Sequence, residues 1–207
     1  MVQVGGQPAE QGAAPARLRR AGHEAADRGF LEDVITAEGF VGALAKADLD
    51  AECRRVLPVL QALAKQSRAR LSIDTRKAEV MRRAAQEGAH IINDVSALTH
   101  DAKAMQTAAE TGLPVVLMHA RGEPRTMQDS PTYADVVLDI CDWLEERVEA
   151  CERAGIPRDR LIVDPGIGFG KTLAHNLALL SSLGLLHGLG CAVLLGASRK
   201  SFIGRLT

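Results

Sequence analysis

From residue 70 onward, short apolar runs alternate with segments whose apolar residues recur at helical spacing. The runs are continuously apolar, which is typical of parallel strands that are buried on both faces of a sheet. The pattern predicts five strands, at residues 70–75, 90–96, 114–119, 160–164 and 192–198.

The segments between these runs predict helices. In one long segment Val136, Ile140 and Leu144 recur on a single face, and glycines follow several helical segments, where they favour a helix stop. Strand–helix alternation of this kind fits two architectures, a (β/α)8 barrel and an open doubly wound sheet. The expected helices span residues 50–68, 77–88, 101–112, 133–155 and 176–186.

Polar residues at the carboxyl ends of all five strands favour the barrel. A barrel brings all its strand ends to one mouth, whereas an open sheet brings together only those at its switch point. For any single residue, a polar strand end that simply meets water is the alternative. We expect an α/β fold of the TIM type, incompletely closed, with five parallel strand–helix units around one pocket. The polar strand ends are Asp74, Thr75, Asn93, Asp94, His119, Asp164, Ser198, Arg199 and Lys200.

The beginning of the chain lacks this pattern. Residues 5–29 are rich in Ala, Gly and Arg, and residues 30–36 give only a weak strand pattern. We therefore divide the chain into a divergent segment of unclear structure, residues 1–49, and a barrel domain, residues 50–207.

The composition excludes several classes of protein. A net charge of -1 and 3% aromatic residues argue against a nucleic-acid binder and against a polybasic membrane anchor. The four cysteines form no C-x-x-C pair, and the first residues do not resemble a secretory signal, so we expect a cytoplasmic protein with reduced thiols. The uncharged stretch between Lys171 and Arg199 contains His, Asn, Ser and several glycines, and is not expected to span a membrane.

Common motifs do not account for the polar strand ends. The run PGIGFGKT, residues 165–172, has the wrong glycine spacing for a phosphate-binding P-loop, and the six histidines show no metal-ligand spacing. What remains is two carboxylates, an amide and two cations: Asp74, Asp164, Asn93, Arg199 and Lys200. Such a set suits a planar heterocycle with N–H donors and carbonyl acceptors on its edge, and the cations suit a phosphorylated leaving group.

The strand-end motifs SIDT, IINDVS, LMHARGEP, DPGIGFGK and GASRKSFIG occur in this order. Together they resemble the dihydropteroate synthase family, TIM-barrel enzymes of folate biosynthesis, over roughly residues 50–207. The family joins 6-hydroxymethyl-7,8-dihydropterin pyrophosphate to 4-aminobenzoate and releases pyrophosphate. The Asp and Asn positions alone are shared with other pterin-dependent barrels, such as methyltetrahydrofolate methyltransferases.

The resemblance implies roles for the matching residues. Asp74, Asn93 and Asp164 would bind the pterin edge, and Lys200 would contact the pterin carbonyl from the opposite side. Phe169 and Ser198 would line the aminobenzoate pocket. Arg199 and Lys200 are the implied catalytic cations.

The sequence also departs from the family pattern. The family's magnesium-binding Asn has no counterpart, so Mg²⁺ is implied by the resemblance but no ligand is assigned. The loop VGGQPAEQGAAP lacks the family's Ser-Thr-Arg, and an Arg-His strand end is absent. We expect the chain as written to be a poor synthase that keeps part of its pterin affinity. A truncated or frame-shifted remnant that at most binds pterin stays an alternative function, and so does another pterin-dependent barrel enzyme such as a methyltetrahydrofolate methyltransferase. The expected assembly is a homodimer.

Overall fold

The computed structural model describes most of the chain from residue 49 onward and three short strands before it. For the residues before 49, and for residue 205, the backbone alone is described. The described residues are 2–5, 17–19, 34–38, 49–122, 127, 131–198, 200 and 203–205.

The strands form one curved sheet in the order β2-β1-β3-β4-β5-β6-β7-β8. Only β1 and β2 pair antiparallel, and every other neighbouring pair is parallel. Within the described residues the sheet is therefore an open barrel with β2 and β8 at its edges. The strands are β1 (Val2–Gly5), β2 (Arg17–Arg19), β3 (Val34–Glu38), β4 (Arg70–Asp74), β5 (Ile91–Asp94), β6 (Val115–Met118), β7 (Leu161–Asp164) and β8 (Ala192–Val193).

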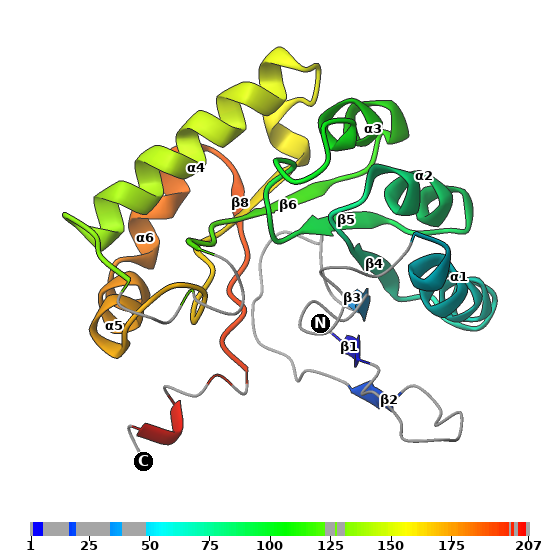
Figure 1. Cartoon of the computed structure of the whole chain (residues 1–207), viewed down its shortest axis with the longest axis horizontal. Helices are drawn as coiled ribbons and strands as arrows, with labels where there is room; N and C mark the ends of the chain where they lie inside the picture. The colour runs from blue at the N-terminus through cyan, green and yellow to red at the C-terminus, as the bar shows by residue number, and fades with distance from the viewer. Residues whose placement is uncertain are drawn as a thin grey trace.

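The α-helices cover the convex face of this sheet and leave its concave face to the strand ends and loops (Figure 1). They are α1 (Leu49–Gln66), α2 (Ala78–Gln86), α3 (Ala104–Thr111), α4 (Val136–Arg153), α5 (Leu173–Ser181) and α6 (Leu183–Leu186). Short 3-10 helices lie at Arg158–Arg160, His187–Leu189 and Ile203–Arg205. No helix in the described part of the chain is long and apolar enough to cross a membrane.

The five parallel strands and their helices confirm the fold expected from the sequence, with three differences. The expectation of little strand structure before residue 70 is wrong, since β1, β2 and β3 extend the sheet there, and β3 pairs in parallel with β4. The last strand, β8, is only two residues long. The helix expected at residues 176–186 is divided into α5 and α6 around Ser182. The domain boundary at residue 49 stays a prediction.

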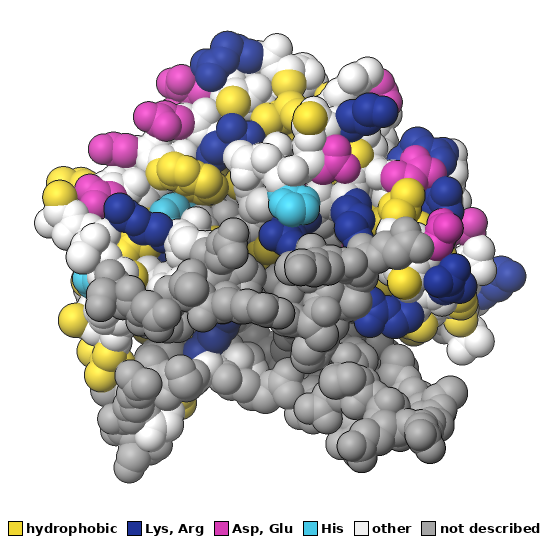
Figure 2. Space-filling view, viewed as in Figure 1, with side chains coloured by type: hydrophobic (Ala, Val, Ile, Leu, Met, Phe, Trp, Pro, Cys, Tyr) yellow, Lys and Arg dark blue, Asp and Glu magenta, His cyan; other side chains and the backbone are white. Residues whose placement is uncertain are grey.

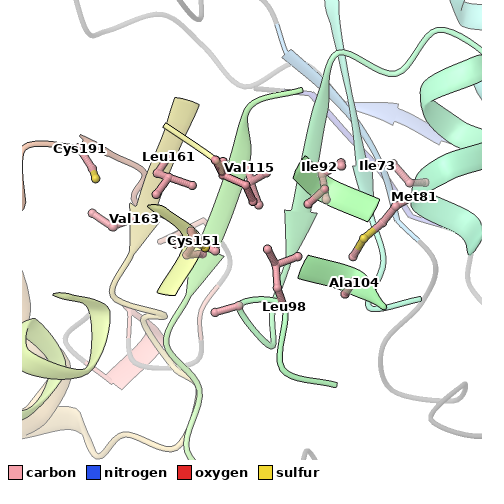
Figure 3. Close-up of a cluster of buried hydrophobic side chains, with 14 of the residues drawn as sticks. Ile73, Met81, Ile92, Leu98, Ala104, Val115, Cys151, Leu161, Val163 and Cys191 are labelled. Carbon is pink, nitrogen blue, oxygen red and sulfur yellow. The ribbon is translucent and has the colours of Figure 1, made fainter. Parts of the chain in front are cut away.

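Side-chain alternation along the strands creates two separate cores. Neighbouring residues of a strand point to opposite faces of the sheet. Every second residue, such as Ile73, Ile92, Val115 and Val163, packs in the large core between sheet and helices (Figure 3). The residues between them form a small inner core on the concave face, made of Ile91, Val116 and Ile162 with Leu194 against it.

A buried carboxylate shapes the loop after β5. Asp94 lies on the helix side, fully buried, and accepts hydrogen bonds from the Ser96 amide (2.7 Å), the Ser96 hydroxyl (2.6 Å) and the Leu98 amide (3.1 Å). The loop needs this support because Ala97 and Leu98 both adopt positive φ, 50° and 62°, which costs energy for residues with a Cβ. Asp94 therefore stabilises the turn that follows β5.

Replacing Asp94 with Ala should lower the free energy of unfolding by about 2–3 kcal/mol, because it leaves buried donors without acceptors in a strained turn. Urea denaturation measures the change. Asp159→Ala, at an exposed carboxylate, is the control and should change stability by less than about 0.5 kcal/mol. Equal stability of the two variants would contradict this role of Asp94.

Candidate functional site

Three of the polar strand ends lie on the concave face of the sheet. Asp74 on β4 is paired in register with Asn93 on β5, and Asp164 on β7 is paired with Met118 on β6. Asp74, Asn93, Asp164 and the apolar Met118 lie on the same strand face as the inner core. The concave face therefore carries two carboxylates and an amide above an apolar floor.

Three other polar residues that the sequence analysis placed at the same mouth lie instead on the helix side. Thr75 donates to Glu52 of α1 (2.5 Å), Asp94 supports the turn described above, and His119 packs edge-on against Trp143 of α4. This part of the expectation is wrong. The reason is alternation, since each of these residues directly follows one that points inward.

The loop after β7 is packed directly against the end of β6. A Cβ on Gly166 would lie 1.9 Å from the His119 carbonyl oxygen, and one on Gly170 would lie 2.3 Å from that of Arg121. Both glycines also adopt positive φ. Only glycine fits such an approach, which accounts for two of the glycines in the DPGIGFGK motif. The Gly168 amide donates to the Asn176 side chain of α5 (2.8 Å).

Asp164 is a buried carboxylate of the concave face with a perturbed pKa. It is 6% exposed, and its Oδ1 accepts a hydrogen bond from the Gly166 amide (2.7 Å). Burial raises the pKa of Asp164 to about 6, against the opposing effects of the Gly166 hydrogen bond and of the positive charges of Lys200 and Lys171. The carboxyl thus titrates near neutral pH and keeps acceptor capacity for a ligand.

An aromatic ring and a cation lie next to this carboxyl. The Lys200 ammonium is 4.0 Å from the centre of the Phe169 ring, a cation–π contact. Ser198 is exposed in the loop after β8. Arg199 lies outside the described residues. The binding roles of Asp74, Asn93, Asp164, Phe169, Ser198, Arg199 and Lys200 stay predictions.

A buried cation that the sequence analysis missed lies behind the loop. Lys171 is 3% exposed and is surrounded by His119 and the loop backbone. The sequence analysis took this lysine only as part of a failed P-loop match. Its burial follows from Gly166 and Gly170, which allow the loop to pack closely against the end of β6. This is a tertiary contact, which the local sequence pattern does not show.

A cavity of about 200 Å³ opens beside the site. Met118 and Phe169 line one side of it, and Arg76 and Ser96 contribute polar groups. Asp74, Asn93 and Asp164 do not line it, so it is a neighbouring hollow and not the space above the carboxylates. Within the described residues no group of three His, Cys, Asp or Glu side chains could hold a metal ion.

A family model described as pterin binding enzyme matches residues 33–207. The chain belongs to this pterin-binding enzyme family. The dihydropteroate synthase of Escherichia coli K12 is 46% identical over 162 residues. The sulfonamide complex of the Yersinia pestis dihydropteroate synthase superposes with a TM-score of 0.80 at 44% identity. The Xanthomonas albilineans enzyme, solved with 7,8-dihydropteroate, gives a TM-score of 0.75 at 43% identity.

The match covers most of this chain and a smaller part of each relative. It spans 78% of this chain and 57% of the E. coli protein. For the Y. pestis structure the shares are 84% and 63%, and for the X. albilineans structure 84% and 61%. The chain therefore spans less than two thirds of the length of these relatives, and the shared part includes the concave face described above.

The close approach of the loop to β6 predicts a sharp difference between two glycine substitutions. Gly166→Ala should lower the free energy of unfolding by at least about 3 kcal/mol, because its Cβ would collide with the His119 carbonyl. Gly112→Ala is the matched control, since Gly112 has a similar φ of +72° but nothing within 4 Å of its Cβ position. This control should cost only about 1–2 kcal/mol of backbone strain. Thermal unfolding compares the two variants, and equal losses would rule out the steric explanation.

Proposed function

We propose that this chain acts as a dihydropteroate synthase, joining 6-hydroxymethyl-7,8-dihydropterin pyrophosphate to 4-aminobenzoate. Family membership supports the proposal, and the observation that carries it is the buried Asp164 carboxyl beside the Lys200–Phe169 pair. The X. albilineans relative has been solved with 7,8-dihydropteroate and, separately, with 4-aminobenzoic acid. We extend both ligands to this chain.

In the proposed reaction the amine of 4-aminobenzoate attacks the methylene carbon attached to the pterin ring. The new C–N bond forms as the C–O bond to pyrophosphate breaks, pyrophosphate leaves with the bonding electrons, and the amine proton passes to solvent. The main catalytic demand is stabilisation of the departing negative charge. We assign this to Lys200 and Arg199.

The pterin ring would be held from two sides. Ionised Asp164 accepts hydrogen bonds from the amino group and ring N–H of the aminopyrimidinone edge, and charged acceptors make bonds roughly twice as strong as neutral ones. Asp74 and Asn93, paired in register, would bind the pterin edge together with Asp164, and Lys200 would contact the pterin carbonyl from the opposite side. Phe169 and Ser198 would form one wall of the aminobenzoate pocket.

Three further assignments rest on the resemblance. Magnesium would be a cofactor, but the described residues do not provide a cluster of His, Cys, Asp or Glu side chains that fits it. A cytoplasmic location follows the expected class of enzyme. A homodimer is supported by the exposed leucines Leu177 and Leu185 on α5 and α6. Figure 2 shows apolar side chains at the lower left of the surface, on the side where α5 lies in Figure 1. Light scattering on the purified chain measures its oligomeric state.

A second candidate function is pterin binding without turnover. The loop VGGQPAEQGAAP lacks the Ser-Thr-Arg expected to contact pyrophosphate, and this favours the second candidate. Binding and turnover must therefore be measured separately on the same chain. Pyrophosphate release with both substrates at about 1 per second or faster would support synthase activity and reject the second candidate.

Binding of 6-hydroxymethylpterin should depend on pH through Asp164. The ionised carboxylate accepts the pterin N–H groups, so affinity should fall as the pH drops through about 6. Calorimetry between about pH 5 and pH 7.5 measures this profile. Asp164→Asn should bind at least about tenfold more weakly at neutral pH and lose the dependence. The control Asp159→Asn should keep both, and an unchanged profile in Asp164→Asn would reject the assignment.

A further inference from the structure

We propose that Lys171 is a positioning residue for pterin binding: its buried ammonium ties the loop after β7 to the end of β6 and holds a positive charge behind Asp164. The inference rests on the proposed function, because its readout is pterin binding. It adds a residue that neither contacts the concave face nor was expected from the sequence.

The Lys171 ammonium joins two segments of the chain. Its Nζ lies 3.0 Å from His119 Nδ1 and donates to the His119 carbonyl (3.3 Å) and to the Phe169 carbonyl (2.9 Å). Two of the three contacts are at the end of β6 and one is in the loop after β7. An ammonium has three donors, so these contacts use all of them.

The His119 ring can accept a hydrogen bond from the Lys171 ammonium. Burial, together with the positive charge of Lys171, lowers the pKa of His119 to about 3, so the imidazole is neutral and its Nδ1 can accept. The His119 amide in turn donates to the Asp164 carbonyl (2.9 Å). His119 therefore connects Lys171 to the strand end that carries the site carboxyl.

The hydrogen bonds of Lys171 also hold Phe169 in place. Phe169 gives its carbonyl to Lys171 while its ring lies against Lys200. Its amide donates to the Gly166 carbonyl (3.0 Å), which closes the turn. Without the ammonium, the Phe169 carbonyl and the His119 ring would lose a shared donor, and the loop would be free to move relative to Asp164.

The buried charge of Lys171 carries an energetic cost. Burial lowers the pKa of Lys171 to about 7, which reflects the removal of a charge from water. Lys171→Met would also leave the His119 ring and two carbonyl groups without a donor, so it should lower stability as well. A role in the site is therefore read from the pH profile of binding and not from stability.

The charge acts on Asp164 in the range where that carboxyl titrates. Three groups lower the pKa of Asp164 and so favour its ionised form. They are Lys171 in the loop after β7, Lys200 beyond β8 and the Gly166 amide. Arg121 also acts on His119. Below about pH 7 Lys171 is predominantly protonated, so its removal should make Asp164 harder to ionise.

The test compares pH profiles of 6-hydroxymethylpterin binding, measured by calorimetry, for the wild-type chain, Lys171→Met, Lys171→Gln and Lys171→Arg. Met and Gln should shift the midpoint upward and weaken binding at about pH 6, because Asp164 loses a neighbouring positive charge. Arg keeps the charge and should restore most of the profile. Lys65→Met, at an exposed lysine of α1, is the matched control and should leave the profile unchanged.

The outcomes separate this inference from the proposed function. If the wild-type chain does not bind the pterin, the proposed function fails. If it binds and the Met and Gln variants keep its midpoint, the positioning role of Lys171 is overturned. Thermal unfolding of each variant is measured in parallel, and binding is compared at a temperature at which every folded variant stays folded. If Met and Gln fail to fold while Arg folds, the lysine serves stability and the inference is also overturned.

Discussion

Neighbouring residues of a strand point to opposite faces of a sheet, and this constraint divides the polar strand ends of the chain into two groups. Asp74, Asn93 and Asp164 lie on the concave face, above the inner core of Ile91, Val116 and Ile162. Thr75, Asp94 and His119 point toward the helices, and Asp94 stabilises the turn after β5. The site is thus a consequence of strand register, because a shift of one residue would exchange the two groups.

The site also depends on how closely the loop after β7 approaches β6. Because Gly166 has no Cβ, its backbone can approach the His119 carbonyl more closely than any other residue would allow. Lys171 donates a hydrogen bond to the same carbonyl. The result is a carboxyl whose burial raises its pKa to about 6 while nearby cations keep it ionisable. A carboxyl of this kind is predominantly ionised at neutral pH and keeps acceptor capacity for N–H groups.

Much of the fold could be predicted from the sequence, because five continuous apolar runs and their helices are local patterns. The strands before residue 49 could not, since β3 joins the sheet through pairing with β4, and β1 and β2 follow through pairing with β3 and with each other. For the site, the motif DPGIGFGK led to Asp164 and Phe169. It did not reveal Lys171, whose burial follows from tertiary packing, nor the face on which Thr75, Asp94 and His119 lie. Continuous apolar strands carry no alternation from which the two faces could be told apart.

The most direct test of the account is a crystal structure of this chain with 6-hydroxymethylpterin. The account predicts the aminopyrimidinone edge within hydrogen-bond distance of both Asp164 carboxylate oxygens, with the ring on the concave face between the Asp74–Asn93 pair and Phe169. A pterin bound in the neighbouring cavity beside Arg76 and Ser96, with no contact to Asp164, would contradict it.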